Sequence, residues 1–225
     1  IRVFYLRIDP ETAFNMTGYV EDYVRGTKHT FGILHMITNL PEFYLQYPIP
    51  EKYQEDMDNL IDKNEKLYTQ QKFSSEDCFK SLLILYKWID AVSYQNMSEY
   101  FDAEPGDIFY IKENAKDLVY TFTEIVKFWR DYAKENEQKN IVSEYQNLID
   151  ESDLLKLQII HGVPEKYLEL VKIKQIGRVR AQILYKNGYK NRTILKKVSL
   201  EKLAAIDKIG MIIAKSIKSQ VEKVR

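Results

Sequence analysis

The sequence of 225 residues contains few of the residue types that cross-link a chain or bind metal: one cysteine and three histidines, with eight glycines and six prolines. The single cysteine, Cys78, excludes a disulfide or a cysteine-based zinc site within the chain, and its apolar surroundings predict a small buried side chain. His29, His35 and His161 are too scattered to predict a metal cluster. His35 lies among apolar residues and is predicted to be a core histidine.

Several functional signatures are also missing. No apolar run reaches the roughly 18 residues of a membrane span, no signal peptide is evident, and the lack of cysteine pairs favours a cytoplasmic protein. There is no GxxxxGK[ST] phosphate loop and no Asp-Glu box, so the sequence predicts no site of nucleotide hydrolysis. The carboxylates follow no catalytic motif and are expected to solvate helix faces. No enzyme activity, cofactor or metal is therefore predicted for this stretch by itself.

The formal net charge of zero conceals two oppositely charged parts. Residues 1–155 hold 16 Lys and Arg against 28 Asp and Glu, a net charge of −12, whereas residues 156–225 hold 17 against 5, a net charge of +12. This asymmetry predicts two modules, the basic one suited to a polyanion. It is equally compatible with two parts that attract each other.

The longest regular pattern runs from Asp107 to Tyr132. Apolar residues recur there at steps of three and four, which predicts one long amphipathic helix. A second stripe of the same spacing is polar and aromatic, and comprises Tyr110, Asn114, Asp117, Thr121 and Phe128. Such a face either lines a ligand path or is an ordinary solvated surface with two aromatic residues.

The remaining patterns predict an all-α fold. Residues 1–8 are rich in β-formers and read as the remnant strand of a truncated domain. Asp9 and Pro10 form a good helix start. Further helices are expected over about 30–40, 51–71, 75–92, 98–101 and 137–160, the last with a break near 150–153 left open. The prediction is a six- or seven-helix bundle over residues 9–155, followed by a small domain over residues 156–225.

The basic part contains an internal repeat. Residues 173–181 match residues 206–214 at an offset of 33, with the pattern apolar-x-x-apolar-Gly-x-x-x-Ala. This pattern predicts two helix-hairpin-helix units, in which the glycine permits a tight turn and the free N–H groups of the second helix hold phosphate. The counter-charge is expected from Arg178, Arg180, Lys186, Lys190 and Lys208, with Lys215 and Lys218 nearby. The usual first glycine is replaced by Gln175 and Lys208, so either hairpin is open to a purely structural interpretation.

Five stretches resemble the C-terminal part of archaeal superfamily-two DNA helicases of the Ski-two-like group, relatives of the polymerase-theta helicase. These are YLRIDPETA, FGILHMITNLPEF, LLILYKWIDAVS, EYFDAEPGDIFYIKENAKDLVY and GVPEKYLELVKIKQIGRVRAQILYKNGY. The resemblance implies that residues 1–8 end a winged-helix domain, that residues 9–155 form the ratchet bundle, and that residues 156–225 form the last domain, which grips emerging single strand.

The resemblance also implies partners and cofactors. The whole enzyme would be a monomeric, ATP-dependent 3′–5′ DNA helicase of fork repair and recombination, with ATP and Mg²⁺ in motor domains absent from this sequence. Single-stranded or forked DNA and those missing motor and winged-helix domains would be the partners, and no membrane is involved. The family's stacking Arg and Trp on the ratchet helix fall on Tyr110 and Asp117, of which only Tyr110 can stack. The family pattern Gly-Arg-Val-Arg-Ala-Arg appears as Gly177 to Gln182, with two of its three arginines.

Two other hypotheses stand beside DNA binding. The acidic bundle suits a protein-interaction module, as found in related RNA-remodelling helicases. An independent enzyme has no support in the sequence. The predicted nucleic-acid contacts are Tyr110, Asn114, Arg178, Arg180, Lys186, Lys190 and Lys208.

Overall fold

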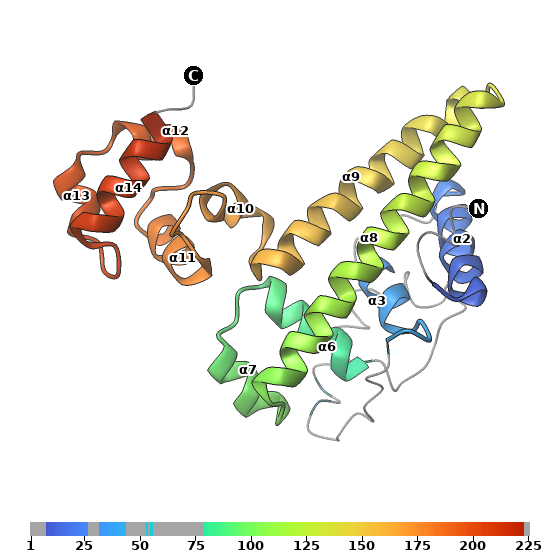
Figure 1. Ribbon diagram of the computed structural model, residues 1–225, viewed down its shortest axis with the longest axis horizontal. Helices are drawn as coiled ribbons and strands as arrows, with labels where there is room; N and C mark the ends of the chain where they lie inside the picture. The colour runs from blue at the N-terminus through green and yellow to red at the C-terminus, as the bar shows by residue number, and fades with distance from the viewer. Residues whose placement is uncertain (1–7, 27–31, 44–52, 54, 56–78, 223–225) are drawn as a thin grey trace.

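The computed structural model describes residues 8–26, 32–43, 53, 55 and 79–222. This part of the chain contains eleven helices and no strand, so the all-α prediction is confirmed. The predicted strand over residues 1–8, apart from Ile8, and most of the predicted helix 51–71 lie outside the described residues, as do His29 and Cys78. Figure 1 shows a larger lobe built around the long helices α8 and α9, and a smaller lobe attached at the end of α9.

The larger lobe begins with four helices, of which the first three pack on the long pair and the fourth packs on the third. They are α2 (Pro10–Val24), α3 (Gly32–Thr38), α6 (Phe79–Ile89) and α7 (Tyr94–Phe101). Asp9 caps α2 as predicted, since its carboxylate accepts a hydrogen bond from the N–H of Glu11 at 2.8 Å. His35 in α3 is buried, which confirms the core assignment.

Helix α8 (Pro105–Glu135) is the spine of the larger lobe. Its 31 residues extend the predicted helix at both ends, and the Asp107 carboxylate caps it by accepting from the N–H of Glu104 at 3.2 Å. The predicted apolar stripe is buried, from Ile108 and Ile111 to Ile125 and Val126.

Helix α9 (Lys139–His161) runs back along α8 without interruption, so the break considered near residues 150–153 is wrong. The polar residues there fit the helix. Ser152 is buried and its hydroxyl donates to the carbonyl of Leu148 at 2.6 Å, within one turn. Asp153 bonds Lys156 at 2.9 Å, again within one turn.

The smaller lobe comprises five short helices: α10 (Glu165–Val171), α11 (Arg178–Lys186), α12 (Arg192–Lys197), α13 (Leu200–Ala204) and α14 (Gly210–Glu222). Its buried side chains form a second hydrophobic cluster from Val163 to Val221, separate from the cluster that ends with Ile159 in the larger lobe. The domain boundary predicted at 155/156 falls inside α9. Leu154 and Leu157 on its last turns pack against the second cluster, so the helix serves both lobes.

Among the described residues, no group of three or more His, Cys, Asp and Glu side chains is arranged to hold a metal ion. None of the described helices is both long enough and apolar enough to cross a membrane.

Candidate nucleic-acid interface

Each of the two repeats has a residue with left-handed backbone at the same position of its turn, but the repeat glycines differ, with φ of −86° at Gly177 and 58° at Gly210. Gln175, between α10 and α11, has φ of 70°, and Lys208, between α13 and α14, has φ of 59°. Left-handed backbone is uncommon for residues other than glycine, and these two residues stand where the helix-hairpin-helix pattern has its first glycine. Each turn is therefore retained despite the substitution. In the first copy the left-handed residue is Gln175 and not Gly177, whose φ is −86°, so the expected role of Gly177 in a tight turn is wrong there.

Arg180 ties the two turns together. Its Nε donates to the carbonyl of Lys208 and its Nη1 to the carbonyl of Gln175, both at 2.8 Å. A guanidinium presents its donors in a rigid planar fork, so one side chain fixes the spacing of the two turns. Arg180 was predicted to bind phosphate, but two of its nitrogens already donate hydrogen bonds to backbone carbonyls. Its role in the structure is to hold the two turns together.

A concavity of about 600 Å³ opens at this junction, lined by Gly177, Arg178, Val179, Arg180 and Lys208. Helix α11 starts here, and its first backbone bond runs from the N–H of Ala181 to the carbonyl of Gly177 at 3.0 Å. The N–H groups of the preceding three residues have no acceptor within the helix. They sit at the positive end of the helix dipole, an arrangement that favours an oxyanion.

Arg178 has a different environment from the one the sequence predicted. Its guanidinium carbon lies 4.1 Å from the centroid of the Trp88 ring and 5.8 Å from that of Tyr94, and its Nη2 donates to the carbonyl of Val92. Burial lowers the pKa of Arg178, an effect that nearby Tyr94 partly offsets. Nη1 is buried without a partner among the described residues. Arg178 nevertheless lines the concavity described above.

Trp88 is the centre of the contact between the lobes. Its Nε1 donates to the carbonyl of Ile159 in α9 at 2.6 Å. Gln182, at the family's third arginine position, donates to the carbonyl of Ala91 at 2.9 Å. Position 182 therefore joins α11 to the end of α6. Sequence reasoning missed Trp88, because neither spacing nor charge marks an aromatic residue that receives a cation from a distant segment.

The lysines are distributed over the small lobe. Lys208 is exposed in the concavity. Lys186 and Lys190 are exposed at the other end of α11, where the Nζ of Lys190 lies 5.4 Å from the Tyr185 ring centroid. The structure does not bring these two to the concavity, since α11 spans nine residues, or about 12 Å. Lys218 has a structural role, donating to the carbonyls of Lys196 and Val198 at 2.7 and 2.8 Å.

The stripe on α8 is only partly open. Tyr110 is 41% exposed and Asn114 is half-buried, but Thr121 is only 7% exposed and does not belong to an open face. Asp117 is exposed beside Lys116, with 3.5 Å between oxygen and nitrogen. Phe109 was not predicted from the sequence as a surface residue of this helix; it is 55% exposed, and the Nζ of Lys112 lies 4.7 Å from the centroid of its ring. The sequence contained one indication of its exposure: Phe109 is a large aromatic residue that lies outside the apolar stripe of the helix.

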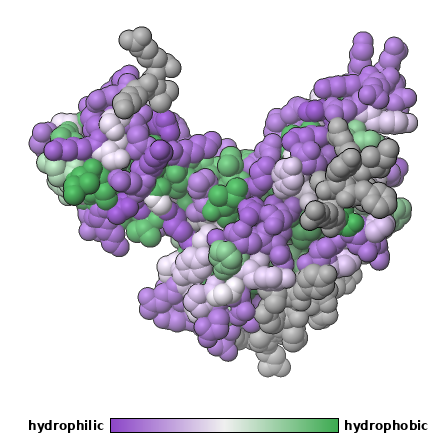
Figure 2. Space-filling view, viewed as in Figure 1, coloured by the Kyte–Doolittle hydropathy of each residue, from purple (hydrophilic) through white to green (hydrophobic). Residues whose placement is uncertain are grey.

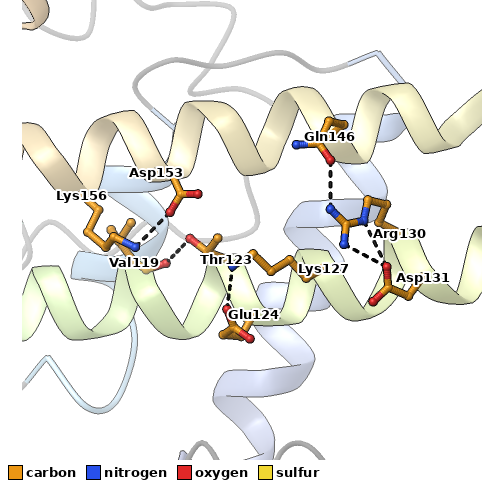
Figure 3. A network of polar contacts seen from close by, with 9 residues as sticks. All are labelled: Val119, Thr123, Glu124, Lys127, Arg130, Asp131, Gln146, Asp153 and Lys156. Carbon is orange, nitrogen blue, oxygen red and sulfur yellow. Dashed lines mark hydrogen bonds and ion pairs between the residues drawn. The ribbon is translucent and has the colours of Figure 1, made fainter. Parts of the chain in front are cut away.

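Cations of the larger lobe are largely neutralised by their neighbours. Figure 3 shows Lys127 bonded to Glu124 at 2.8 Å, and Arg130 bonded to both Asp131 and Gln146 at 2.9 Å. The bond to Gln146 also joins α8 to α9. By contrast, the described residues place no carboxylate within ion-pair distance of Lys208, Lys186 or Lys190. These three lysines of the small lobe therefore keep an exposed positive charge that no described carboxylate neutralises.

This architecture, a helical bundle followed by a basic lobe of paired hairpins, agrees with the comparison of the sequence with protein families. Residues 31–143 match the family described as archaeal helicase, domain 4. The chain belongs to the archaeal superfamily-two helicases and corresponds to their C-terminal part.

Individual relatives carry the name ATP-dependent DNA helicase Hel308. The chain is 29% identical over 224 residues to that of Pyrococcus abyssi, 30% over 226 residues to that of Pyrococcus horikoshii, and 31% over 219 residues to that of Methanocaldococcus jannaschii. Each match covers 96% of this chain but only 29%, 29% and 16% of the relative. The chain therefore spans less than a third of the length of these relatives.

Proposed function

We propose that this chain binds single-stranded DNA as the C-terminal part of an ATP-dependent 3′–5′ DNA helicase, and that it guides and grips the strand during translocation. The observation that carries the proposal is the concavity between the two hairpin turns. It combines free amides at the start of α11 with the exposed Lys208, in a part of the chain with a net charge of +12. The helicase activity that we propose for the full-length enzyme is inferred from the name of the relatives.

The two lobes would divide this work. In the larger lobe, Tyr110 and Asn114 on the outer face of α8 would line the strand's path, with Phe109 as an additional stacking surface. In the small lobe, the amides of Arg178 to Arg180 and the ammonium of Lys208 would hold phosphate. Arg180 would keep the site in shape, and Lys186 and Lys190 would add long-range attraction. We place the functional boundary at Gly162, where α9 ends.

ATP and Mg²⁺ would bind motor domains of the parent enzyme and not this chain, which would bind DNA without hydrolysing nucleotide. Forked DNA and those motor and winged-helix domains are the proposed partners, and the chain would act as a monomer.

The test is fluorescence anisotropy with a labelled thymidine oligonucleotide over a salt series. Phosphate contacts release counterions, so log Kd should rise steeply with log salt concentration. Lys208→Ala should weaken binding and reduce the salt slope by about one. Lys139→Ala is the matched control, because Lys139 is an exposed lysine at the far end of α9. Salt-independent binding, or equal effects of the two variants, would contradict the proposal.

The acidic larger lobe supports a second candidate, a docking surface for another protein. Its exposed Phe14, on α2, is 77% accessible and far from any basic cluster in sequence. A pull-down that recovers a protein ligand, together with no gel shift on single-stranded DNA, would favour this function over the first.

A further inference from the structure

The two hairpins present different chemistry at equivalent positions. At the 33-residue offset, Arg178, Val179 and Arg180 of the first copy correspond to Met211, Ile212 and Ile213 of the second. The second hairpin keeps the left-handed turn but replaces both arginines with apolar residues. It therefore lacks counterparts of both arginines of the first hairpin and keeps Lys208 as the cation of its turn.

Met211 and Ile212 are exposed and do not belong to the core, whereas Ile213 is partly buried and packs against the hydrophobic cluster of the lobe. Ile212 is 81% accessible and Met211 is 46% accessible, whereas the core face of α14 is formed by Ala214, Ile217 and Val221. Figure 2 shows apolar surface on this lobe, in the region of α13 and α14, within a hydrophilic surrounding. An isoleucine exposed to this extent gains little from folding, so the packing of the lobe does not account for the patch formed by Met211 and Ile212.

Cations flank the patch along the chain. Lys208 precedes it in the turn, and Lys215 follows Met211 by four residues, which places the two side chains on one face of α14. Both lysines are exposed. The patch is thus an apolar spot between two positive charges, and Arg180 fixes its turn relative to the start of α11.

The small area of the patch and the two lysines beside it indicate which kind of ligand it can bind. Two side chains offer far less than the roughly 800 Å² per partner of a stable protein–protein interface. A single strand of DNA, in contrast, presents apolar base faces next to phosphates and fits a small apolar spot flanked by lysines. We propose that the start of α14 packs Met211 and Ile212 against unpaired bases, while the start of α11 holds the phosphates. This inference rests on the proposed function and adds to it which part of the strand each hairpin contacts.

The test compares two strands on the intact chain: a thymidine oligonucleotide, and an abasic strand of the same length that keeps the phosphates but lacks bases. Ile212→Ala should weaken binding to the thymidine strand about fivefold, from the lost apolar contact. It should leave the abasic strand and the salt slope unchanged. Ile160→Ala, at an exposed isoleucine of α9, is the matched control and should leave both affinities unchanged.

Each outcome bears on a separate claim. If the wild type binds the thymidine strand and Ile212→Ala has no effect, or affects both strands equally, the base contact is wrong while the proposed function stands. If the wild type binds neither strand, the proposed function fails and this inference fails with it. Self-association in sedimentation that Ile212→Ala abolishes would assign the patch to a second copy and overturn the inference.

Discussion

Gly162 ends α9 at a position where the left-handed backbone and the nearby Trp88 ring both favour glycine. Its φ is 60°, and a Cβ built there would lie 2.5 Å from Cε2 and Cζ2 of Trp88. Left-handed backbone costs an ordinary residue about 1–2 kcal/mol, and the clash adds to this cost because the indole is held by its bond to Ile159. The residue that separates the lobes is therefore also the one that allows Trp88 to sit between them.

Gly162→Ala should lower the free energy of unfolding by more than 2 kcal/mol, a sum of the backbone cost and the displacement of Trp88. Gly106→Ala is the matched control. Gly106 lies in the first turn of α8 with open space around it, so alanine there should be neutral or stabilising by up to about 1 kcal/mol. Urea denaturation of both variants provides the measurement, and similar stabilities would refute the packing argument.

His161 predicts a pH dependence of stability. Burial, reinforced by nearby Lys172, lowers the pKa of His161 below its unfolded value of about 6.5. Between the two pKa values the unfolded chain binds more protons, so stability falls as pH drops below about 6.5. Replacing His161 with Gln removes this term, so the wild type should lose more thermal stability between pH 7.5 and pH 5.5 than His161→Gln. Parallel losses would show that His161 contributes nothing.

At the scale of elements, α8 has an inner face that holds the bundle together and an outer face available to a ligand. Phe122 on the inner face is fully buried and meets Tyr19 edge to face, with 5.6 Å between ring centroids. Phe109 on the outer face has no such partner in the core. Phe122 is therefore expected to contribute to the stability of the bundle, whereas Phe109 is expected to contribute little.

Phe122→Ala should destabilise the chain by about 3–5 kcal/mol, the usual cost of truncating a buried phenylalanine. Phe109→Ala should change stability by less than about 0.5 kcal/mol, yet weaken single-strand binding if the outer face of α8 lines the strand's path. Chemical denaturation and anisotropy on the same samples separate the two effects. A stability loss in Phe109→Ala as large as that in Phe122→Ala would contradict the assignment of faces.

These elements also show what the sequence was able to predict. The core stripe of α8 followed from helical periodicity, because that signal is local. The continuity of α9 through Asp150–Asp153 did not follow, since those polar residues bond within their own helix. The stacking of Arg178 on Trp88 was not predictable from the sequence, because the two residues are 90 positions apart. The positive charge of Arg178 alone suggested a phosphate as its partner.

At the scale of the molecule, the polar contacts between the lobes gather around one aromatic ring. Trp88 is packed in the bundle, and Arg178 and Gln182 reach it and its surroundings from α11. A cation over a tryptophan face contributes about 1 kcal/mol, and more when desolvated. These polar contacts add to the apolar packing of Ala91, Leu154 and Leu157 against the second cluster, whereas most of each lobe's core lies within that lobe.

Arg178→Ala removes the stacking cation without cutting into either core. Small-angle X-ray scattering should show a larger radius of gyration than for the wild type, because the lobes separate more readily. Arg192→Ala, in the small lobe and away from Trp88, is a control expected to leave the profile unchanged. Superimposable profiles for Arg178→Ala and the wild type would mean that other contacts set the arrangement.

The central claim is that a single DNA strand lies across the hairpin junction of the small lobe. Photo-crosslinking of a 4-thiothymidine oligonucleotide, followed by peptide mass spectrometry, locates the strand directly. We predict crosslinks to the peptides that carry residues 177–180 and 208–212, with a further crosslink near Tyr110 on α8. Crosslinks confined to other parts of the bundle, or none at all at low salt, would contradict the account.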